Sequence, residues 1–203
     1  ITGAKREGSD VVLTIDSALS ASIYNLMGNT KGAVVLMNYQ TGEILASVSK
    51  PGFDPNNIKA YMGQTDAGDS PLVNRVTMGR YTPGSVFKII TAAASLETQS
   101  DALTRTYTCT GKKVVGDITI TDANNEVHGK LNLKQAFTVS CNNTFATIGM
   151  ELGANTINDM AEKFGFNKNF LFNDLVLYSS SYVKSAKMGD IAWSAAGQYK
   201  DVV

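Results

Sequence analysis

The chain has 203 residues, 43% hydrophobic and 18% charged, and its 18 basic residues balance its 18 acidic ones. This composition excludes a disordered or low-complexity protein, and the zero net charge argues against a nucleic-acid-binding surface. Two Cys and one His exclude a disulfide scaffold and argue against a His-rich metal site. We therefore expect a globular α/β-type domain whose function must be sought in local motifs.

The first part of the chain predicts a helix followed by a β-hairpin. Asp16 or Ser17 caps the helix, which ends at residues 28–29. Two apolar runs, 33–37 and 43–48, flank a Tyr-Gln-Thr-Gly turn, a pattern typical of a hairpin. Because the first run is apolar throughout, we expect its strand to be buried on both faces of a sheet covered by helices.

The second part of the chain predicts mostly helices. It follows a loop-like stretch at 50–75 that is punctuated by Pro, Gly, Asn and Asp. Residues 86–96 are apolar nearly all round, which indicates a helix through the middle of a core. The polar stretch 107–127 predicts a small ribbon. The other helices are predicted at 131–139, 143–152, 156–164 and 186–196. We find no internal repeat and no linker that divides the chain.

The pattern Ser-x-x-Lys occurs three times, starting at Ser47, Ser85 and Ser181. Only Ser85 and Lys88 lie at the start of a strongly predicted helix, where residues three apart share a face. Apolar surroundings that lower the pKa of Lys88 would let its amine act as base for a Ser85 nucleophile. Free N–H groups at the helix start would stabilise an oxyanion, and Gly84 would give a substrate access to the backbone. The alternative is that Ser85 only caps the helix and that Lys88 is solvated.

A second motif, Ser140-Cys141-Asn142, falls between two predicted helices. A hydroxyl and a carboxamide two residues apart can point from such a loop into one cleft. Ser140 could then relay a proton between Lys88 and an amine, and Asn142 could bind a substrate amide. The alternative is that Asn142 or one of the next two residues simply caps the following helix.

Together and in this order, the two motifs resemble those of penicillin-binding proteins, the D,D-transpeptidases of bacterial cell-wall synthesis. The segment 81–90, Tyr-Thr-Pro-Gly-Ser-Val-Phe-Lys-Ile-Ile, resembles their nucleophile segment in the form typical of the monofunctional class B branch. Residues 140–145 resemble their second motif. Similar stretches also lie at 11–19, 42–46, 53–56 and 197–198. The resemblance thus covers nearly the whole chain.

The resemblance implies a penicillin-binding/serine β-lactamase-like fold of the α/β (α+β) class, with helices on the faces of an antiparallel sheet and a helical lobe. It implies that Ser85 is acylated by the penultimate D-Ala of a peptidoglycan stem peptide. Lys88 would be the base, Ser140 would shuttle the proton, and Asn142 would position the substrate amide. β-Lactams would mimic the D-Ala-D-Ala end and trap the acyl-enzyme. No metal and no organic cofactor is implied.

The family carries a third motif, Lys-Ser/Thr-Gly, and no such tripeptide occurs in this sequence; the nearest, 187–189, lacks the hydroxyl. We therefore expect residues 1–203 to be the N-terminal part of a single transpeptidase domain, without its last strands, its pedestal and its membrane anchor, and with impaired activity by itself. The implied location is the extracytoplasmic face of the bacterial membrane. The implied partners are stem peptides, β-lactams and other cell-wall synthesis proteins, with no nucleic acid.

Three other functions remain open on the same motifs. A serine β-lactamase or D,D-carboxypeptidase would share the fold and would turn penicillin over. A β-lactam sensor domain would stay acylated without cross-linking stem peptides. An inactive scaffold would not be acylated at all.

The two cysteines and the histidine carry less information. Cys109 and Cys141 could form a disulfide in an oxidising compartment, but we expect two unpaired thiols. His128 precedes a Gly in a turn and has no evident partner, so we expect it to be structural.

Overall fold

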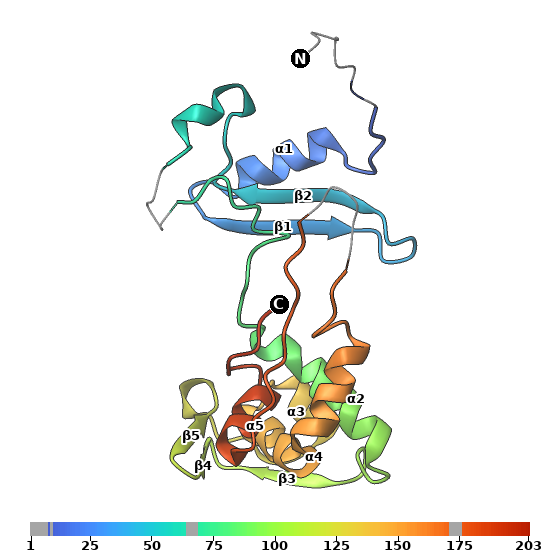
Figure 1. Ribbon diagram of the computed structural model, residues 1–203. Coiled ribbons are helices and arrows are strands. Elements are labelled where there is room, and N and C mark those ends of the chain that lie inside the picture. Colours follow the sequence, from blue (N-terminus) through green and yellow to red (C-terminus); the bar gives the residue numbers. More distant parts are fainter. Residues whose placement is uncertain (1–7, 9, 64–68, 171–175) are drawn as a thin grey trace. The chain divides into compact units, whose positions relative to one another are not determined.

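The computed structural model describes residues 8, 10–63, 69–170 and 176–203 (Figure 1). The chain forms two compact units, Ile1–Gly79 and Arg80–Val203, and each is described by itself. Among the described residues, no helix is long and apolar enough to cross a membrane.

The first unit is a helix packed on a β-hairpin. Helix α1 (Ser17–Leu26) begins after Asp16, whose side chain accepts a hydrogen bond from the backbone of Leu19. Strands β1 (Gly32–Met37) and β2 (Ile44–Lys50) pair antiparallel, and α1 lies against β2 (Figure 1). A 3₁₀ turn, η1 (Pro55–Ala60), follows. The predicted helix and hairpin are therefore confirmed.

The prediction that the strand at 33–37 is buried on both faces is wrong. No residue of β1 is buried, and Val35, Leu36 and Met37 are 42–53% exposed. A continuously apolar strand needs neighbours on both edges and both faces to be covered. In the described part of this unit, β1 pairs only with β2.

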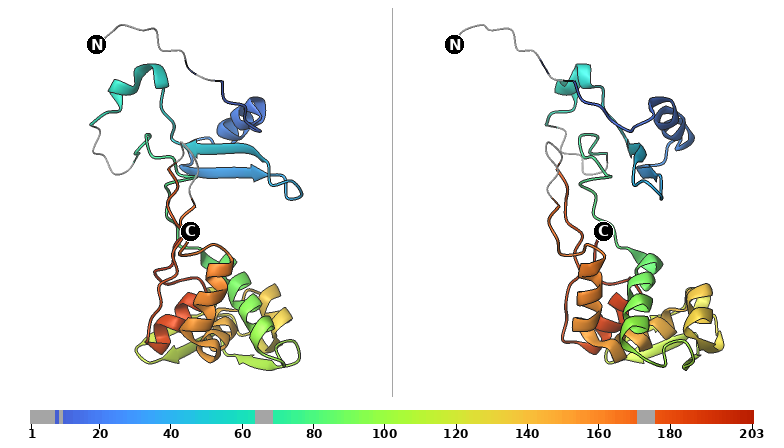
Figure 2. Two further views of the ribbon diagram at one scale, coloured as in Figure 1. Left: turned by 45° about the vertical axis from the view of Figure 1, so that its right-hand side comes forward. Right: turned by 90° about the vertical axis from the view of Figure 1, so that its right-hand side faces the viewer.

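The second unit is a helical bundle bordered by two short ribbons (Figure 2). Its elements are, in chain order, η2 (Gly84–Phe87), α2 (Lys88–Thr98), β3 (Thr106–Cys109), β4 (Lys112–Val115), β5 (Ile118–Thr121), η3 (Ala123–Asn125), β6 (Gly129–Asn132), α3 (Leu133–Thr138), α4 (Asn142–Lys163) and α5 (Met188–Ala195). Strand β3 pairs with β6, and β4 pairs with β5, both antiparallel. Helix α4 packs against both α2 and α5.

The core of this unit lies where α2, α4 and α5 meet. Phe87 is 1% exposed, stacks on Tyr182 with 5.8 Å between ring centroids, and meets Phe166 edge to face at 5.6 Å. Burying a Phe side chain contributes roughly 1.5–3 kcal/mol. Phe87 therefore anchors the chain to the core two residues after Ser85.

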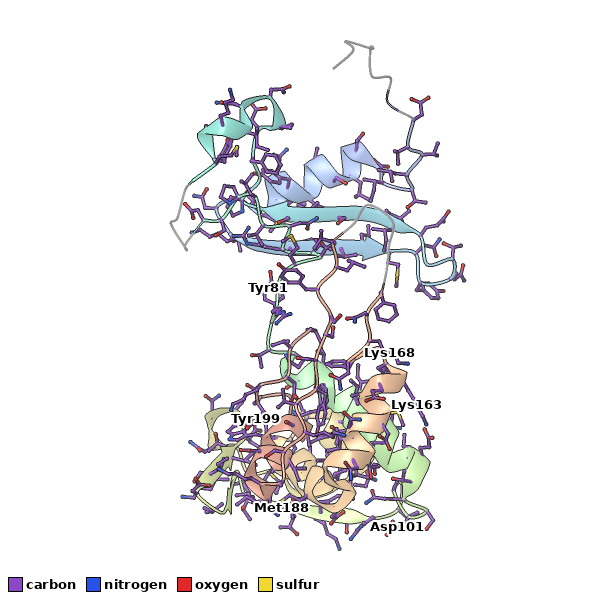
Figure 3. All side chains as sticks on the ribbon, viewed as in Figure 1. Tyr81, Asp101, Lys163, Lys168, Met188 and Tyr199 are labelled. Atoms are coloured by element: carbon purple, nitrogen blue, oxygen red, sulfur yellow. The ribbon has the colours of Figure 1, made fainter. Side chains whose placement is uncertain are left out.

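The backbone also closes around the segment that carries Ser85. Tyr81 and Val203 exchange two backbone hydrogen bonds of 2.9 Å, and Figure 3 marks the position of Tyr81. Lys163 near the end of α4, which Figure 3 labels, forms an ion pair with Glu97 of α2. The chain just before Ser85 is thus tied to Val203, and the far end of α2 is tied to α4.

The predicted helices 143–152 and 156–164 are confirmed as the two halves of α4, which are separated by a kink at Gly153, where φ is +76° and ψ is 163° and the backbone is not helical. Two other predicted elements differ in the second unit. The predicted helix 131–139 begins only at Leu133, because the two residues before it pair with β3. The run 86–96 does not cross the middle of the core, since Val86, Ile89 and Leu96 are 47–63% exposed. The ribbon predicted within 107–127 is confirmed by β4 and β5.

Candidate active site

Ser85 lies in a tight turn that places it directly over Lys88. We call residues 82–87 the Ser85 turn. It contains the 3₁₀ helix η2, and a 3₁₀ helix has three residues per turn, so side chains at i and i+3 eclipse each other. The Ser85 Oγ and Lys88 Nζ atoms are 3.0 Å apart. Ser85 is exposed, whereas Lys88 is only 1% exposed. The alternative of a capping Ser beside a solvated Lys is therefore wrong, since the residue before η2 is Pro83 and no side chain caps the turn.

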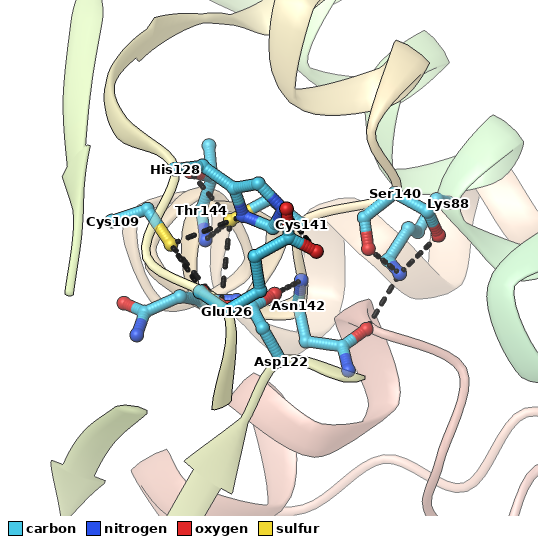
Figure 4. A network of polar contacts seen from close by, with 10 residues as sticks. Lys88, Cys109, Asp122, Glu126, His128, Ser140, Cys141, Asn142 and Thr144 are labelled. Carbon is cyan, nitrogen blue, oxygen red and sulfur yellow. Dashed lines mark hydrogen bonds and ion pairs between the residues drawn. The ribbon is translucent and has the colours of Figure 1, made fainter. Parts of the chain in front are cut away.

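The Lys88 amine is surrounded by oxygen atoms from two segments, and Figure 4 shows those of Ser140 and Asn142. Besides Ser85 Oγ, Nζ lies 2.8 Å from the Ser140 carbonyl, 2.9 Å from Ser140 Oγ and 2.6 Å from Asn142 Oδ1. An ammonium has three protons for these four oxygens, so they cannot all accept a full hydrogen bond at once. A neutral amine instead donates two and accepts one from a hydroxyl. The arrangement suits an amine that exchanges a proton with Ser85 or Ser140.

Burial tunes this amine toward neutrality. It lowers the pKa of Lys88 from 10.5 to about 8, and the nearby charge of Asp122 opposes the shift without cancelling it. About a tenth of the amine is then neutral at one pH unit below that value. A general base with such a pKa is usable near neutral pH.

Ser140 reaches Lys88 through an unusual backbone. We call residues 139–142, between α3 and α4, the Ser140 loop. Ser140 has φ +55°, in the left-handed region that non-Gly residues rarely adopt. In this conformation both its carbonyl and its hydroxyl face Nζ. A strained residue persists only where the surrounding structure holds it in place, and such residues cluster at functional sites.

Asn142 is held from three sides at the start of α4. Its side-chain oxygen meets Lys88, and its amide nitrogen donates to the Thr121 carbonyl at 2.8 Å. Its backbone N–H donates to Asp122 Oδ1 (Figure 4). The residue that caps α4 is Cys141, whose sulfur accepts from the Thr144 backbone at 3.3 Å. The alternative that Asn142 or one of the next two residues merely caps the helix is therefore wrong.

The model of the penicillin binding protein transpeptidase domain matches residues 32–198. The chain belongs to this family. The peptidoglycan D,D-transpeptidase PbpA of Mycobacterium tuberculosis is 34% identical over 191 residues, covering 82% of this chain and 38% of the relative. MrdA of Escherichia coli, also named a peptidoglycan D,D-transpeptidase, is 30% identical over 169 residues, covering 78% of this chain and 26% of the relative. The chain thus spans less than half the length of these relatives.

Solved structures agree with the family and its fold. The penicillin G acyl-enzyme of M. tuberculosis penicillin-binding protein A superposes with a TM-score of 0.88 and 27% identity, covering 99% of this chain and 50% of that one. The D,D-transpeptidase domain of an Eggerthella lenta peptidoglycan glycosyltransferase superposes with a TM-score of 0.82 and 35% identity, covering 94% of this chain and 47% of that one. The mixed helix-and-strand fold expected from the resemblance is confirmed.

The other two Ser-x-x-Lys patterns of this transpeptidase-family chain do not form comparable pairs. The Lys50 ammonium donates a hydrogen bond to the carbonyl of Tyr24. Ser181 forms an isolated β-bridge with Val202. Among the described residues, neither pair has a hydrogen bond between its own Ser and Lys. The structure thus selects the same pair as the sequence argument.

A buried cluster behind the Ser140 loop could hold a metal ion. The possible ligand atoms of Cys109, Asp122, His128 and Cys141 all lie within 4.8 Å of one another (Figure 4). Thiolate, imidazole and carboxylate are the ligands that Zn²⁺ prefers. Asp122 uses one oxygen for the Asn142 backbone and the other for the thiol of Cys109, at 3.2 Å. A cation here would therefore share a ligand with the Ser140 loop.

The structure of this cluster tests the sequence-based expectations for Cys109, Cys141 and His128. Cys109 and Cys141 are free thiols, as expected. Burial raises the pKa of Cys141 to about 12. The expectation that His128 lacks partners is wrong, since its Nδ1 lies 3.4 Å from Cys109 Sγ and its Nε2 lies 3.7 Å from a carboxylate oxygen of Glu126.

Sequence reasoning missed Asp122 and Thr121. The only available signal was an acidic residue within the stretch 107–127, which was predicted to form a small ribbon. That signal does not say that the ribbon ends beside the Ser140 loop, because the contact joins residues about twenty positions apart.

Proposed function

We propose that this chain carries the nucleophile, base and proton relay of a serine-type peptidoglycan D,D-transpeptidase. The observation that carries the proposal is the buried Lys88 amine within hydrogen-bond distance of Ser85 Oγ, Ser140 Oγ and Asn142 Oδ1. Relatives named peptidoglycan D,D-transpeptidases support it, as does the penicillin acyl-enzyme of one relative. In this proposal Ser85, Lys88 and Ser140 are catalytic residues and Asn142 binds substrate.

The first half-reaction is acylation. The neutral Lys88 amine takes the proton from Ser85 Oγ, which attacks the carbonyl of the penultimate D-Ala in a stem peptide. The resulting tetrahedral intermediate collapses, and the bond to the terminal D-Ala breaks. The leaving amine needs a proton, which Ser140 supplies from the Lys88 ammonium across 2.9 Å. Free D-Ala and an ester on Ser85 are the products.

The second half-reaction transfers the acyl group. The amine of a second stem peptide approaches the ester and gives its proton through Ser140 to Lys88. It attacks the ester carbonyl and forms the cross-link, while Ser85 recovers its hydroxyl proton from Lys88. Asn142 keeps its amide oriented throughout, because Thr121 fixes its nitrogen and Lys88 its oxygen. No step of this mechanism uses a cofactor.

The setting of the reaction is part of the same proposal. The chain spans 38% of the length of PbpA, so we propose the reaction for a transpeptidase domain to which residues 1–203 contribute. The substrates would be stem peptides ending in D-Ala-D-Ala, and β-lactams would acylate the same Ser85. A protein that acts on peptidoglycan would lie at the extracytoplasmic face of the bacterial membrane, with other cell-wall synthesis proteins as partners and no nucleic acid.

The test is intact mass spectrometry of the complete transpeptidase domain after exposure to penicillin. We expect one stable adduct of the mass of penicillin, located on Ser85, and no adduct in Ser85→Ala. A folded domain without an adduct would contradict the proposal. Rapid loss of the adduct with penicillin turnover would instead identify a β-lactamase or carboxypeptidase. Stable acylation without cross-linking of stem peptides would identify a sensor.

A further inference from the structure

The Gly-Gln pair at 197–198 has no part in the mechanism above, although it contributes to the family resemblance. Gly197 follows the last turn of α5 with φ +81°. Its N–H donates to the Ser194 carbonyl at 2.8 Å, and the Gln198 N–H donates to the Trp193 carbonyl at 3.0 Å. These two bonds form a Schellman motif, a helix ending that favours glycine at the left-handed position.

The end of α5 touches the Ser85 turn backbone to backbone. The Gly197 carbonyl accepts a 2.9 Å hydrogen bond from the N–H of Gly84, the residue before Ser85. A Cβ atom on Gly197 would lie 1.8 Å from the Gly84 oxygen and 3.0 Å from Phe87 Cβ. Atoms that are not bonded to each other cannot approach so closely, so a side chain at 197 must displace the Ser85 turn, α5 or both.

Helix α5 is poorly placed to give way. Thr91 of α2 donates its buried hydroxyl to the Ala195 carbonyl at 2.9 Å. On another side, a Cβ on Gly149 of α4 would lie 2.1 Å from Ala195 Cβ, so α4 and α5 are in close contact there. The last turn of α5 is therefore held by both α2 and α4. A collision at Gly197 would move the more exposed Ser85 turn.

We propose that Gly197 is a positioning residue that sets the Ser85 turn against the Lys88 amine. The inference rests on the proposed function, because it concerns how Ser85 is held for acylation. Displacing Ser85 Oγ from its 3.0 Å approach to Nζ slows proton transfer and attack, since misplacement of about 1 Å can cost on the order of a hundredfold in rate. The chemical step slows while penicillin affinity changes little.

The experiment compares two glycine variants in the complete domain. Gly197→Ala introduces both a left-handed alanine and the collision. Gly116→Ala is the matched control, since Gly116 has φ +63° in the turn between β4 and β5 and a Cβ there would meet nothing within 4 Å. Fluorescent penicillin is added over a range of concentrations. The time course gives the limiting acylation rate constant, the half-saturating concentration and the labelled fraction.

For Gly197→Ala we expect a limiting rate constant at least tenfold lower, with the labelled fraction and half-saturating concentration near wild type. For Gly116→Ala we expect all three within about twofold of wild type. A role in folding alone would reduce the labelled fraction and leave the rate constant unchanged, and that result would overturn the inference.

A second variant decides the matter if Gly197→Ala does not fold. Thr91→Val keeps the shape of the side chain but frees the end of α5 by removing the bond to Ala195. We expect its limiting rate constant to fall about threefold with the labelled fraction retained, and an unchanged rate constant would refute the inference. Failure of the proposed function has a different signature, because wild type would then remain unlabelled or Ser85→Ala would label.

Discussion

The two segments that meet at Lys88 are fixed in different ways. The Ser85 turn is held by uncharged contacts, namely the backbone bond between Gly84 and Gly197 and the buried ring of Phe87. The Ser140 loop has a strained backbone that polar contacts hold in place, among them the hydrogen bond from the Asn142 N–H to Asp122. The position of Ser85 should therefore respond to steric changes, and the position of Ser140 to changes of charge.

Removing the group that both segments share should have the largest effect. Lys88→Met keeps most of the buried stem but has no amine, so Ser85 loses its base. We expect the acylation rate constant to fall by about 10²–10⁴-fold. The measurement is the time course of labelling with fluorescent penicillin. Lys134→Met, on the exposed face of α3, is the control and should acylate at the wild-type rate. A Lys88→Met domain that acylates normally would show that another group is the base.

The uncharged anchor of the Ser85 turn can be tested with Phe87→Ala. The ring is 1% exposed and packs on two aromatic rings, so its loss leaves a cavity. We expect the free energy of unfolding to fall by about 3–5 kcal/mol. Denaturant titration measures it. Val86→Ala, the neighbouring residue at 63% exposure, should cost less than about 1 kcal/mol. Equal losses in the two variants would mean that Phe87 is not the anchor.

The charged support of the Ser140 loop can be tested with Asp122→Asn. The substitution keeps the shape but removes the charge that strengthens the bond to the Asn142 N–H. We expect a loss of about 1–3 kcal/mol in unfolding free energy and slower acylation. Asp117→Asn, in the exposed turn between β4 and β5, is the matched control and should be neutral. An Asp122→Asn domain with wild-type stability and rate would refute a charged support.

A change of one pH unit, acting on Lys88, should have the smallest effect. Because its amine must be neutral to accept a proton, the acylation rate should rise about tenfold per unit below pH 8 and level off above it. Stability should also rise with pH between about 8 and 10.5. In that window the unfolded chain binds more protons at this group than the folded one does. Lys88→Met should lose that rise in stability. A wild-type rate that is flat from pH 6 to 9 would contradict the lowered pKa.

The sequence predicted the parts of the site that depend on local spacing. Ser85 and Lys88 are three residues apart, so any helical turn brings them together, and the 3₁₀ turn does so more directly than an α-helix. The grouping of Ser140 and Asn142 with them came from family resemblance, because no local rule brings residues more than fifty positions apart into contact.

The unpredicted parts depend on tertiary contacts. Asp122 and Thr121 support the Ser140 loop only because β5 ends beside α4. The burial of the strand at 33–37 was predicted wrongly because apolar composition indicates that a strand needs covering but not what covers it.

The left-handed backbone of Ser140 has a consequence for sequence change. Gly or Asn would relieve about 1 kcal/mol of backbone strain at this position. Neither residue has a hydroxyl to pass a proton to Lys88. A variant library selected only for heat resistance should therefore enrich Gly or Asn at position 140, whereas selection for cross-linking should retain Ser. Thermal stability and cross-linking activity therefore favour different residues at position 140.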